Sequence, residues 1–216
     1  MSLSSKYQRI VRFLERYLAL ITNVWRVKKN AGNRFSLLWA FRHLHLYASD
    51  CDIRIYTKHL GNVHVYMFGR NHQLIIEEGC VIKSGVFWFE DSNCMIQIHK
   101  NTTIEESHLS AAEDGRRLII GEDCMLSRGI SVSTTDSHSI ISLSENRRTN
   151  YGADIVIGNH VWVGKDVSIN KGVTVGNDSV LAGHSVITKD VPCNSIVAGS
   201  PARIVRSGIT WDRKRV

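Results

Sequence analysis

Several features that define common protein classes are scarce or absent in this sequence. No run reaches 18 consecutive apolar residues, so the sequence predicts no membrane-spanning helix. The N-terminus does not resemble a signal peptide, because Arg12, Glu15 and Arg16 interrupt its apolar run. The five cysteines are odd in number, scattered and without a CxxC pair, which argues against a disulfide framework and for a reducing, cytosolic setting. Proline occurs only at Pro192 and Pro201.

Charge is distributed unevenly along the chain. The net charge is +7, but residues 1–49 contain nine Lys or Arg and one Glu, so the remaining residues sum to −1. The basic character therefore belongs to an N-terminal arm. We expect no nucleic-acid partner, because the body of the chain is not basic and contains no recognisable binding motif.

A repeat of six residues dominates the region 157–191. Aliphatic residues recur at Ile157, Val163, Ile169, Val175, Leu181 and Ile187. Four residues after each stands a small one: Val161, Val167, Val173, Ser179, Ser185 and Val191. Helices repeat at 3.6 residues and strands at two, whereas a six-residue period is the signature of a parallel β-helix. Three sixes close one triangular coil, so 157–174 and 175–192 form two coils.

A rougher version of the repeat occupies 50–132. Ile76 and Ile82, Ile98 and Ile104, and Ile120, Leu126 and Val132 keep the six-residue spacing. Cys80 and Cys124 fall on the small inward position, which predicts buried thiols. Breaks fall at 88–97 and 105–117, and we expect the polar second break to protrude as a loop. The predicted fold class is an all-β solenoid.

The first 49 residues predict an α-helical arm. Residues 5–25 have helical apolar spacing with basic residues on the opposite face, and 35–47 is a second apolar segment that we also expect to be helical. We thus expect an arm at 1–49, the solenoid at 50–206 and a tail at 207–216. The arm either caps the solenoid or binds an anionic membrane surface through 1–30.

The largest interruption, 133–154, is the first candidate for chemistry. Loops on a rigid scaffold often carry function, and this one contains His138 with Asp136 two residues before it. An imidazole suits proton transfer near neutral pH, and a carboxylate can orient it.

The hexads, the loop histidine, the segment Gly158–Gly164 (GNHVWVG) and the ending around 186–206 together resemble the hexapeptide-repeat O-acetyltransferases. The capsular-polysaccharide and galactoside/maltose acetyltransferases are the types it resembles most, strongly over 118–206 and loosely over 50–117. The resemblance implies a left-handed parallel β-helix, a homotrimer with active sites between subunits, and acetyl-CoA as co-substrate without a metal. From the resemblance together with the cysteine pattern, which favours a reducing compartment, we expect a cytoplasmic enzyme with peripheral membrane contact if the arm binds lipid.

The resemblance also implies roles for individual residues. His138 matches the family's catalytic base, and Asp136 is expected to orient or charge-balance its ring. Trp162, which stands 24 residues after His138, matches a tryptophan that lines the acceptor and thioester tunnel. Residues that match positions along coenzyme A are Lys165 and Gly183 beside the pantetheine arm, Thr188 and Lys189 at the nucleotide end, and Arg203 and Arg206 after the Gly-x-Pro turn.

The implied reaction is direct acetyl transfer to a sugar hydroxyl. The galactoside type's N-terminal acceptor region is not recognisable here, which favours a saccharide or polysaccharide precursor as acceptor over free galactosides or maltose. Three alternatives stay open. They are N-acetylation of an amino sugar, a non-catalytic hexapeptide scaffold, and a metal enzyme of the γ-carbonic-anhydrase kind with His138, His160 and His184 as ligands.

Overall fold

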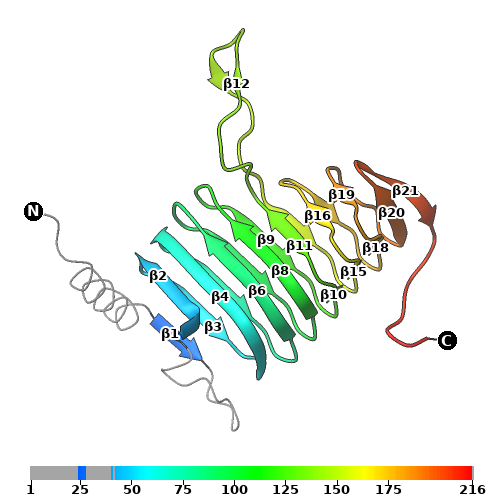
Figure 1. Ribbon diagram of the computed structural model, residues 1–216, viewed down its shortest axis with the longest axis horizontal. Coiled ribbons are helices and arrows are strands. Elements are labelled where there is room, and N and C mark those ends of the chain that lie inside the picture. Colours follow the sequence, from blue (N-terminus) through cyan, green and yellow to red (C-terminus); the bar gives the residue numbers. More distant parts are fainter. Residues whose placement is uncertain (1–23, 28–39, 41, 216) are drawn as a thin grey trace, which may run out of the picture.

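The chain winds into a parallel β-solenoid whose coils stack along one axis (Figure 1). The computed structural model describes residues 24–27, 40 and 42–215. Most of the helix predicted at 5–25 lies outside these residues. Its last two positions belong to a strand, β1 (Val24–Val27), which pairs in parallel with the coil that follows.

The first face of the solenoid is a seven-stranded parallel sheet. Its members, in spatial order, are β1, β3 (Asp52–Ile55), β5 (Gln73–Ile76), β7 (Met95–Ile98), β9 (Arg117–Ile120), β14 (Ile155–Ile157) and β17 (Thr174–Val175). Each contributes one coil, so the order in the sheet follows the order in the chain.

The other two faces share a twelve-stranded sheet that forks at one strand. Its undivided part contains β2 (Leu44–Ser49), β4 (His59–Arg70), β6 (Val81–Phe89) and β8 (Thr103–Ala111). Thr103 and Ile104 of β8 pair with β10, whereas residues 107–110 pair with β11. The strand β8 therefore bends from one face of the prism to the next.

The two branches form the second and third faces. The second face continues through β10 (Met125–Leu126), β15 (Trp162–Val163), β18 (Val180–Leu181), β20 (Ser195–Gly199) and the antiparallel β21 (Ala202–Ser207). The third face continues through β11 (Ile130–Ser133), β16 (Ser168–Ile169) and β19 (Val186–Ile187). The only antiparallel hairpin outside these sheets, among the described residues, pairs β12 (Ile141–Ser142) with β13 (Arg147–Arg148).

Coils differ in length between the two ends. Ile76, Ile98 and Ile120 are direct neighbours 22 residues apart, whereas Ile157 and Val175 are neighbours 18 apart. The longer coils have wider interiors, which Phe87 and Phe89 fill at 0% exposure.

The predicted hexad positions are confirmed as the interior of the narrow coils. All twelve of the aliphatic and small positions in 157–191 are buried, with exposures between 0% and the 5% of Val191. Cys80 and Cys124 are also buried, as their hexad positions predicted. Stacking identical inward positions on each other removes a continuous apolar column from water, which is the main stabilisation of such a repeat.

Two loop and helix predictions need correction. Residues 105–111 do not protrude, because they belong to β8, where Leu109 and Ala111 point inward and Glu105, Glu106 and His108 face solvent. The polar residues there mark the outer face of a strand. The segment predicted as helical at 35–47 is a strand from Leu44 onward, since its apolar residues alternate with period two. The sheets thus begin before residue 50.

The loop 133–154 does project, as predicted, and Figure 1 shows its hairpin standing away from the coils. No helix in the described part of the chain has the length and apolar content to span a bilayer. Membrane contact through 1–30 stays a prediction.

The column of inward aliphatics makes a direct stability prediction. Ile157→Ala opens a cavity in a close-packed coil and should lower the free energy of unfolding by about 2–5 kcal/mol. Val156, its outward neighbour at 38% exposure, provides a matched control whose change to Ala should cost less than about 1 kcal/mol. Urea unfolding of the two variants tests this, and equal losses would contradict the assigned inward direction.

Candidate functional site

His138 lies at the rim of a hollow on the third face. The hollow has a volume of ≈ 420 Å³ and is lined by Trp88, Glu90, His108, Ser110, Ser131, Val132, Ser133, Ser137 and His138. Its floor comes from β6, β8 and β11, and Ser137 and His138 enter it from the projecting loop. This size falls within the ~300–1,000 Å³ typical of small-molecule sites.

Asn150 holds the loop around His138 through two backbone groups and the Asp136 carboxylate. Its side-chain oxygen accepts the Ile140 N–H at 2.7 Å, and its Nδ2 donates to the His138 carbonyl at 2.8 Å and to Asp136 Oδ2 at 2.8 Å. The residue is buried at 8% exposure. A buried amide with this many partners specifies one loop conformation, because losing any bond leaves a polar group unsatisfied.

Glu113 anchors the return of the loop from the corner after β8. It pairs with Arg148, accepts Thr135 Oγ1–H at 2.6 Å and accepts the Gly152 N–H at 2.8 Å. Burial alone would raise the pKa of Glu113, but these three bonds outweigh it and hold the pKa below the ordinary value. The Glu113 carboxylate, which comes from a preceding coil, therefore fixes the two ends of the loop where they leave and rejoin the coils.

Lys171 supports the loop from the following coil. Its Nζ pairs with the Asp136 carboxylate and donates to the Asn150 carbonyl at 2.9 Å. The hydrogen bond from Lys171 lowers the pKa of Asp136 most, and the hydrogen bond from Asn150 lowers it further. Sequence reasoning missed these partners: Arg148 and Asn150 lie in the loop itself but have no motif, and Glu113 and Lys171 come from neighbouring coils.

The position of Asp136 differs from the expectation that it orients the His138 ring. Its carboxylate is occupied by Lys171 and Asn150, while the contact between the two residues is the His138 N–H donating to the Asp136 carbonyl at 2.8 Å. Within the described residues, no hydrogen bond joins that carboxylate to the imidazole. In this arrangement Asp136 fixes the loop backbone.

Trp162 lies on the second face, in a separate hollow of ≈ 350 Å³. It is 40% exposed, directed away from the interior as the hexads predicted. Its neighbours there include Lys83, Thr103 and Met125, and Arg213 of the C-terminal tail.

No residue lines both hollows. His138 is in the hollow beside the C-terminal half of β8, and Trp162 is in the hollow beside its N-terminal half. Because β8 bends between two faces, the two side chains are directed away from different sides of the same prism. Within a single chain, His138 and Trp162 therefore do not line a common site, although the family pattern expects them to act together.

The residues expected along coenzyme A fall on different corners of the C-terminal coils. Lys165 and Gly183 stack at the corner between the second and third faces, where the His184 N–H donates to the Lys165 carbonyl at 2.8 Å. A Cβ at Gly164 would lie 2.6 Å from the Gly183 nitrogen, so this corner requires glycine. The coils are thus in close contact here.

The other expected residues lie further toward the C-terminal end. Thr188 and Lys189 are exposed at the corner between β19 and the first face, two coils beyond the loop that carries His138. Arg203 and Arg206 are exposed on β21. The four expected cations therefore lie at two different corners of the coils and on the strand β21.

The C-terminal tail folds back along the second face, which sequence reasoning did not foresee. The Trp211 ring stacks on His160 with centroids 4.3 Å apart, and its Nε1–H donates to the His160 carbonyl at 2.7 Å. Arg213 donates to Asp123 Oδ1 at 3.0 Å and to Thr103 Oγ1 at 3.0 Å. The tail thereby forms one wall of the Trp162 hollow.

His160 links the tail to the coils through both ring nitrogens. Nδ1 lies 2.8 Å from Asp123 Oδ2, and Nε2 lies 2.9 Å from the Trp211 carbonyl. Burial alone would lower the pKa of His160, but these two acceptors outweigh it and raise the pKa above 6.5. His138, His160 and His184 therefore occupy separate surroundings, and among the described residues no group of three or more His, Cys, Asp or Glu is arranged to hold a metal.

The buried cysteines are poor nucleophiles. Burial raises the pKa of Cys80, Cys94 and Cys124 to about 11 in each case. Thiolate formation, which nucleophilic attack requires, is thus suppressed near neutral pH.

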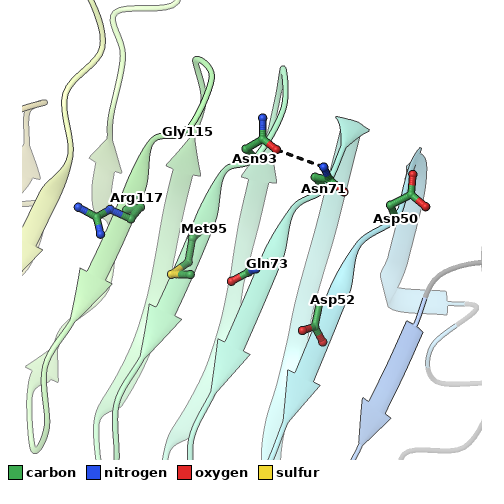
Figure 2. A pocket seen from close by; sticks show the side chains of 8 residues that line it. All are labelled: Asp50, Asp52, Asn71, Gln73, Asn93, Met95, Gly115 and Arg117. Atoms are coloured by element: carbon green, nitrogen blue, oxygen red, sulfur yellow. Dashed lines mark hydrogen bonds between the residues drawn. The ribbon is translucent and has the colours of Figure 1, made fainter.

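A third hollow, of ≈ 270 Å³, lies on the first face in the wide coils. Figure 2 shows its polar lining, in which Asn71 donates to Asn93 at 3.3 Å and Arg117 closes one end. Arg117 is itself paired with Asp154 at 2.9 Å. None of the residues predicted to act in catalysis lines this hollow.

Comparison with known proteins gives consistent matches. Residues 154–189 match the family model described as bacterial transferase hexapeptide (six repeats). The chain is 40% identical over 147 residues to the polysialic acid O-acetyltransferase of Neisseria meningitidis, a match that covers 68% of this chain and 67% of that one. A polysialic acid O-acetyltransferase of Escherichia coli O1:K1 is 42% identical over 116 residues, covering 54% of this chain but 38% of that longer protein.

A solved structure extends the similarity to the fold. The polysialic acid O-acetyltransferase OatWY superposes with a TM-score of 0.69 at 31% identity, covering 81% of this chain and 89% of that one.

The His160 contacts predict a pH-dependent tail. A raised folded pKa means that the contribution of His160 to stability is complete below pH 6.5 and is lost as pH rises through the folded value. The free energy of unfolding of the native protein, minus that of His160→Ala, should therefore be larger at pH 6 than at pH 9. Urea unfolding at both values tests this, and a difference that is constant or grows with pH would contradict it.

Proposed function

Since this chain belongs to the hexapeptide-repeat O-acetyltransferases, which move the acetyl group of acetyl-CoA to a sugar hydroxyl, we propose that His138 is its general base. The observation that carries the proposal is the hollow on the third face, into which the projecting loop delivers His138. The imidazole is the titratable group of the loop best suited to accept a proton near neutral pH.

The proposed step is a direct transfer. The ring of His138 takes the proton of the acceptor hydroxyl as that oxygen attacks the thioester carbonyl. The tetrahedral intermediate then collapses, the C–S bond breaks, and the imidazolium returns the proton to the departing thiolate. This step needs no covalent intermediate on the enzyme, in keeping with the high pKa of the buried thiols.

Asp136 acts in this proposal as a positioning residue. Together with Asn150 and Lys171 it fixes the backbone beside His138, which keeps the ring at the rim of the hollow. Fixing the base before substrate binds lowers the entropic cost of reaching the transition state.

We further propose a homotrimer of left-handed coils with its sites between subunits. Two observations support it. His138 and Trp162 face outward from different sides of one prism. The projecting hairpin also exposes apolar side chains, Leu143 at 98% and Ile140 at 59%, which a neighbouring subunit would cover. In such an assembly the His138 hollow of one subunit meets the Trp162 hollow of the next.

The donor in this proposal is acetyl-CoA, lying between subunits along the C-terminal coils. Lys165 and Gly183 border the pantetheine arm, and Thr188, Lys189, Arg203 and Arg206 receive the nucleotide end. Exposed cations and free backbone N–H groups suit a phosphate-rich ligand. The acceptor is a saccharide or polysaccharide, as in the polysialic acid O-acetyltransferases to which the chain is similar.

Removal of the base gives the direct test. His138→Ala should lower the rate of thiol release from acetyl-CoA, measured with a panel of glycans, by about 10²- to 10⁴-fold. Its folding and affinity for acetyl-CoA should stay unchanged, because the ring makes no described hydrogen bond to the coils.

The matched control is His59→Ala, an exposed histidine on β4 far from the loop, which should retain the native rate. Mass detection of a product that loses its acetyl group in mild alkali identifies an ester and excludes an amide. Native turnover in His138→Ala would refute the proposed base.

A further inference from the structure

We propose that the hollow beside His138 is the acceptor subsite, in which an uncharged pyranose stacks on the indole of Trp88. This rests on the proposed function and specifies which side chains bind the acceptor. The argument begins with a ladder of aromatic rings on the third face of the wide coils.

The ladder runs across three neighbouring strands. Tyr47 stacks on Phe68 with centroids 5.1 Å apart and planes 8° apart, and both Phe68 and Tyr66 pack against Trp88 at 5.1 and 5.4 Å. These contacts hold the Trp88 ring from one side. Such cross-strand aromatic pairs stabilise a sheet and restrict the rings.

The ladder ends at Trp88 because the next two strands carry serine. Ser110 is the direct neighbour of Trp88 on β8, and Ser133 is the neighbour of Ser110 on β11. Strands are about 4.8 Å apart, so the row leaves roughly 10 Å of shallow floor between the indole and the start of the loop. This floor and its walls are the ≈ 420 Å³ hollow.

The shape and chemistry of this space fit a sugar ring. A pyranose presents C–H groups on its faces and hydroxyls around its edge, so an aromatic wall and a polar floor complement it. Trp88 supplies the wall, and Ser110, His108 and Glu90 supply hydrogen-bonding groups. Ser133 lines the floor, but its hydroxyl already donates to the Thr135 carbonyl at 2.8 Å. His138 closes the opposite rim, so a hydroxyl of the stacked ring can reach the base.

The charge of the lining selects among sugars. Within one subunit, the described residues that line the hollow include one carboxylate, Glu90, and neither Lys nor Arg, whereas Lys83 and Arg213 line the Trp162 hollow that a neighbouring subunit would present across from it. A carboxylate accepts hydrogen bonds from neutral hydroxyls and repels an anionic sugar at short range. We therefore expect neutral oligosaccharides to be better acceptors than oligosialic acid.

The test compares the acceptor KM of variants. The acceptors are oligomers of glucose, galactose and N-acetylglucosamine, with oligosialic acid as the anionic member, and thiol release from acetyl-CoA is the readout. Trp88→Ala should raise the KM of the best neutral acceptor about tenfold, with Trp88→Phe between this and the native value, because part of the stacking surface remains. The KM for acetyl-CoA should not change. Tyr47→Ala, at the far end of the same ladder and 51% exposed, is the matched control and should keep the native acceptor KM.

A second variant separates binding from folding. Ser110→Phe extends the aromatic row across the floor, so its thermal midpoint should equal or exceed that of the native protein while acceptor turnover is lost. Native acceptor kinetics in Ser110→Phe, equal acceptor KM in Trp88→Ala and Tyr47→Ala, or a preference for oligosialic acid would each overturn the subsite. A native protein that releases no thiol with any glycan would instead refute the proposed function, and this proposal with it.

Discussion

The parallel register between successive coils is the constraint on which the rest of the structure depends. Each strand must place an inward side chain over its equivalent in the coil below, as Ile157 lies over Ile120 and under Val175. The register removes a continuous apolar column from water, and an extra residue in one coil without a match in its neighbours would break the pairing. Extra chain must therefore leave at a corner. The loop that carries His138 departs after β11 and returns at β14 without disturbing the pairing of β9 with β14.

The fork at β8 determines on which faces the candidate site residues lie. In the wide coils one long strand crosses two faces, and in the narrow coils each face has its own short strand. His138 and Trp162 are thereby placed on different sides of the prism, each beside a hollow. Rigid coils suit such a division, since the register fixes Trp162 on its strand and Glu113 and Lys171 of the coils fix the loop that carries His138. A neighbouring subunit that brings the two hollows together would complete the catalytic geometry.

The regular part of this architecture was predictable, and the irregular part was not. Six-residue spacing identified the interior of 157–191 and the buried positions of Cys80 and Cys124, because local sequence alone determines which side chains point inward. The wide coils follow a 22-residue spacing, seen in Ile76, Ile98 and Ile120, that hexads do not describe. For the candidate site, the projecting loop was predictable from the interruption of the repeat, whereas the role of His138 in that loop stays a prediction. The network of Glu113, Arg148, Asn150 and Lys171 was not, because it joins segments whose proximity only the fold creates, and the contact of Trp211 with His160 has the same origin.

The central claim is that each active site takes His138 from one subunit and Trp162 from another. The most direct measurement is complementation between His138→Ala and Trp162→Ala, two variants that we expect to be inactive alone, co-expressed with different tags and purified through both. If the site lies between subunits of a homotrimer, every trimer that carries both tags has both native residues at one of its three sites, so the purified mixture should recover about a third of native acetyl transfer. If both residues act within one chain, no site contains the intact pair. A mixed oligomer that shows no acetyl transfer would contradict the claim that the active site lies between subunits.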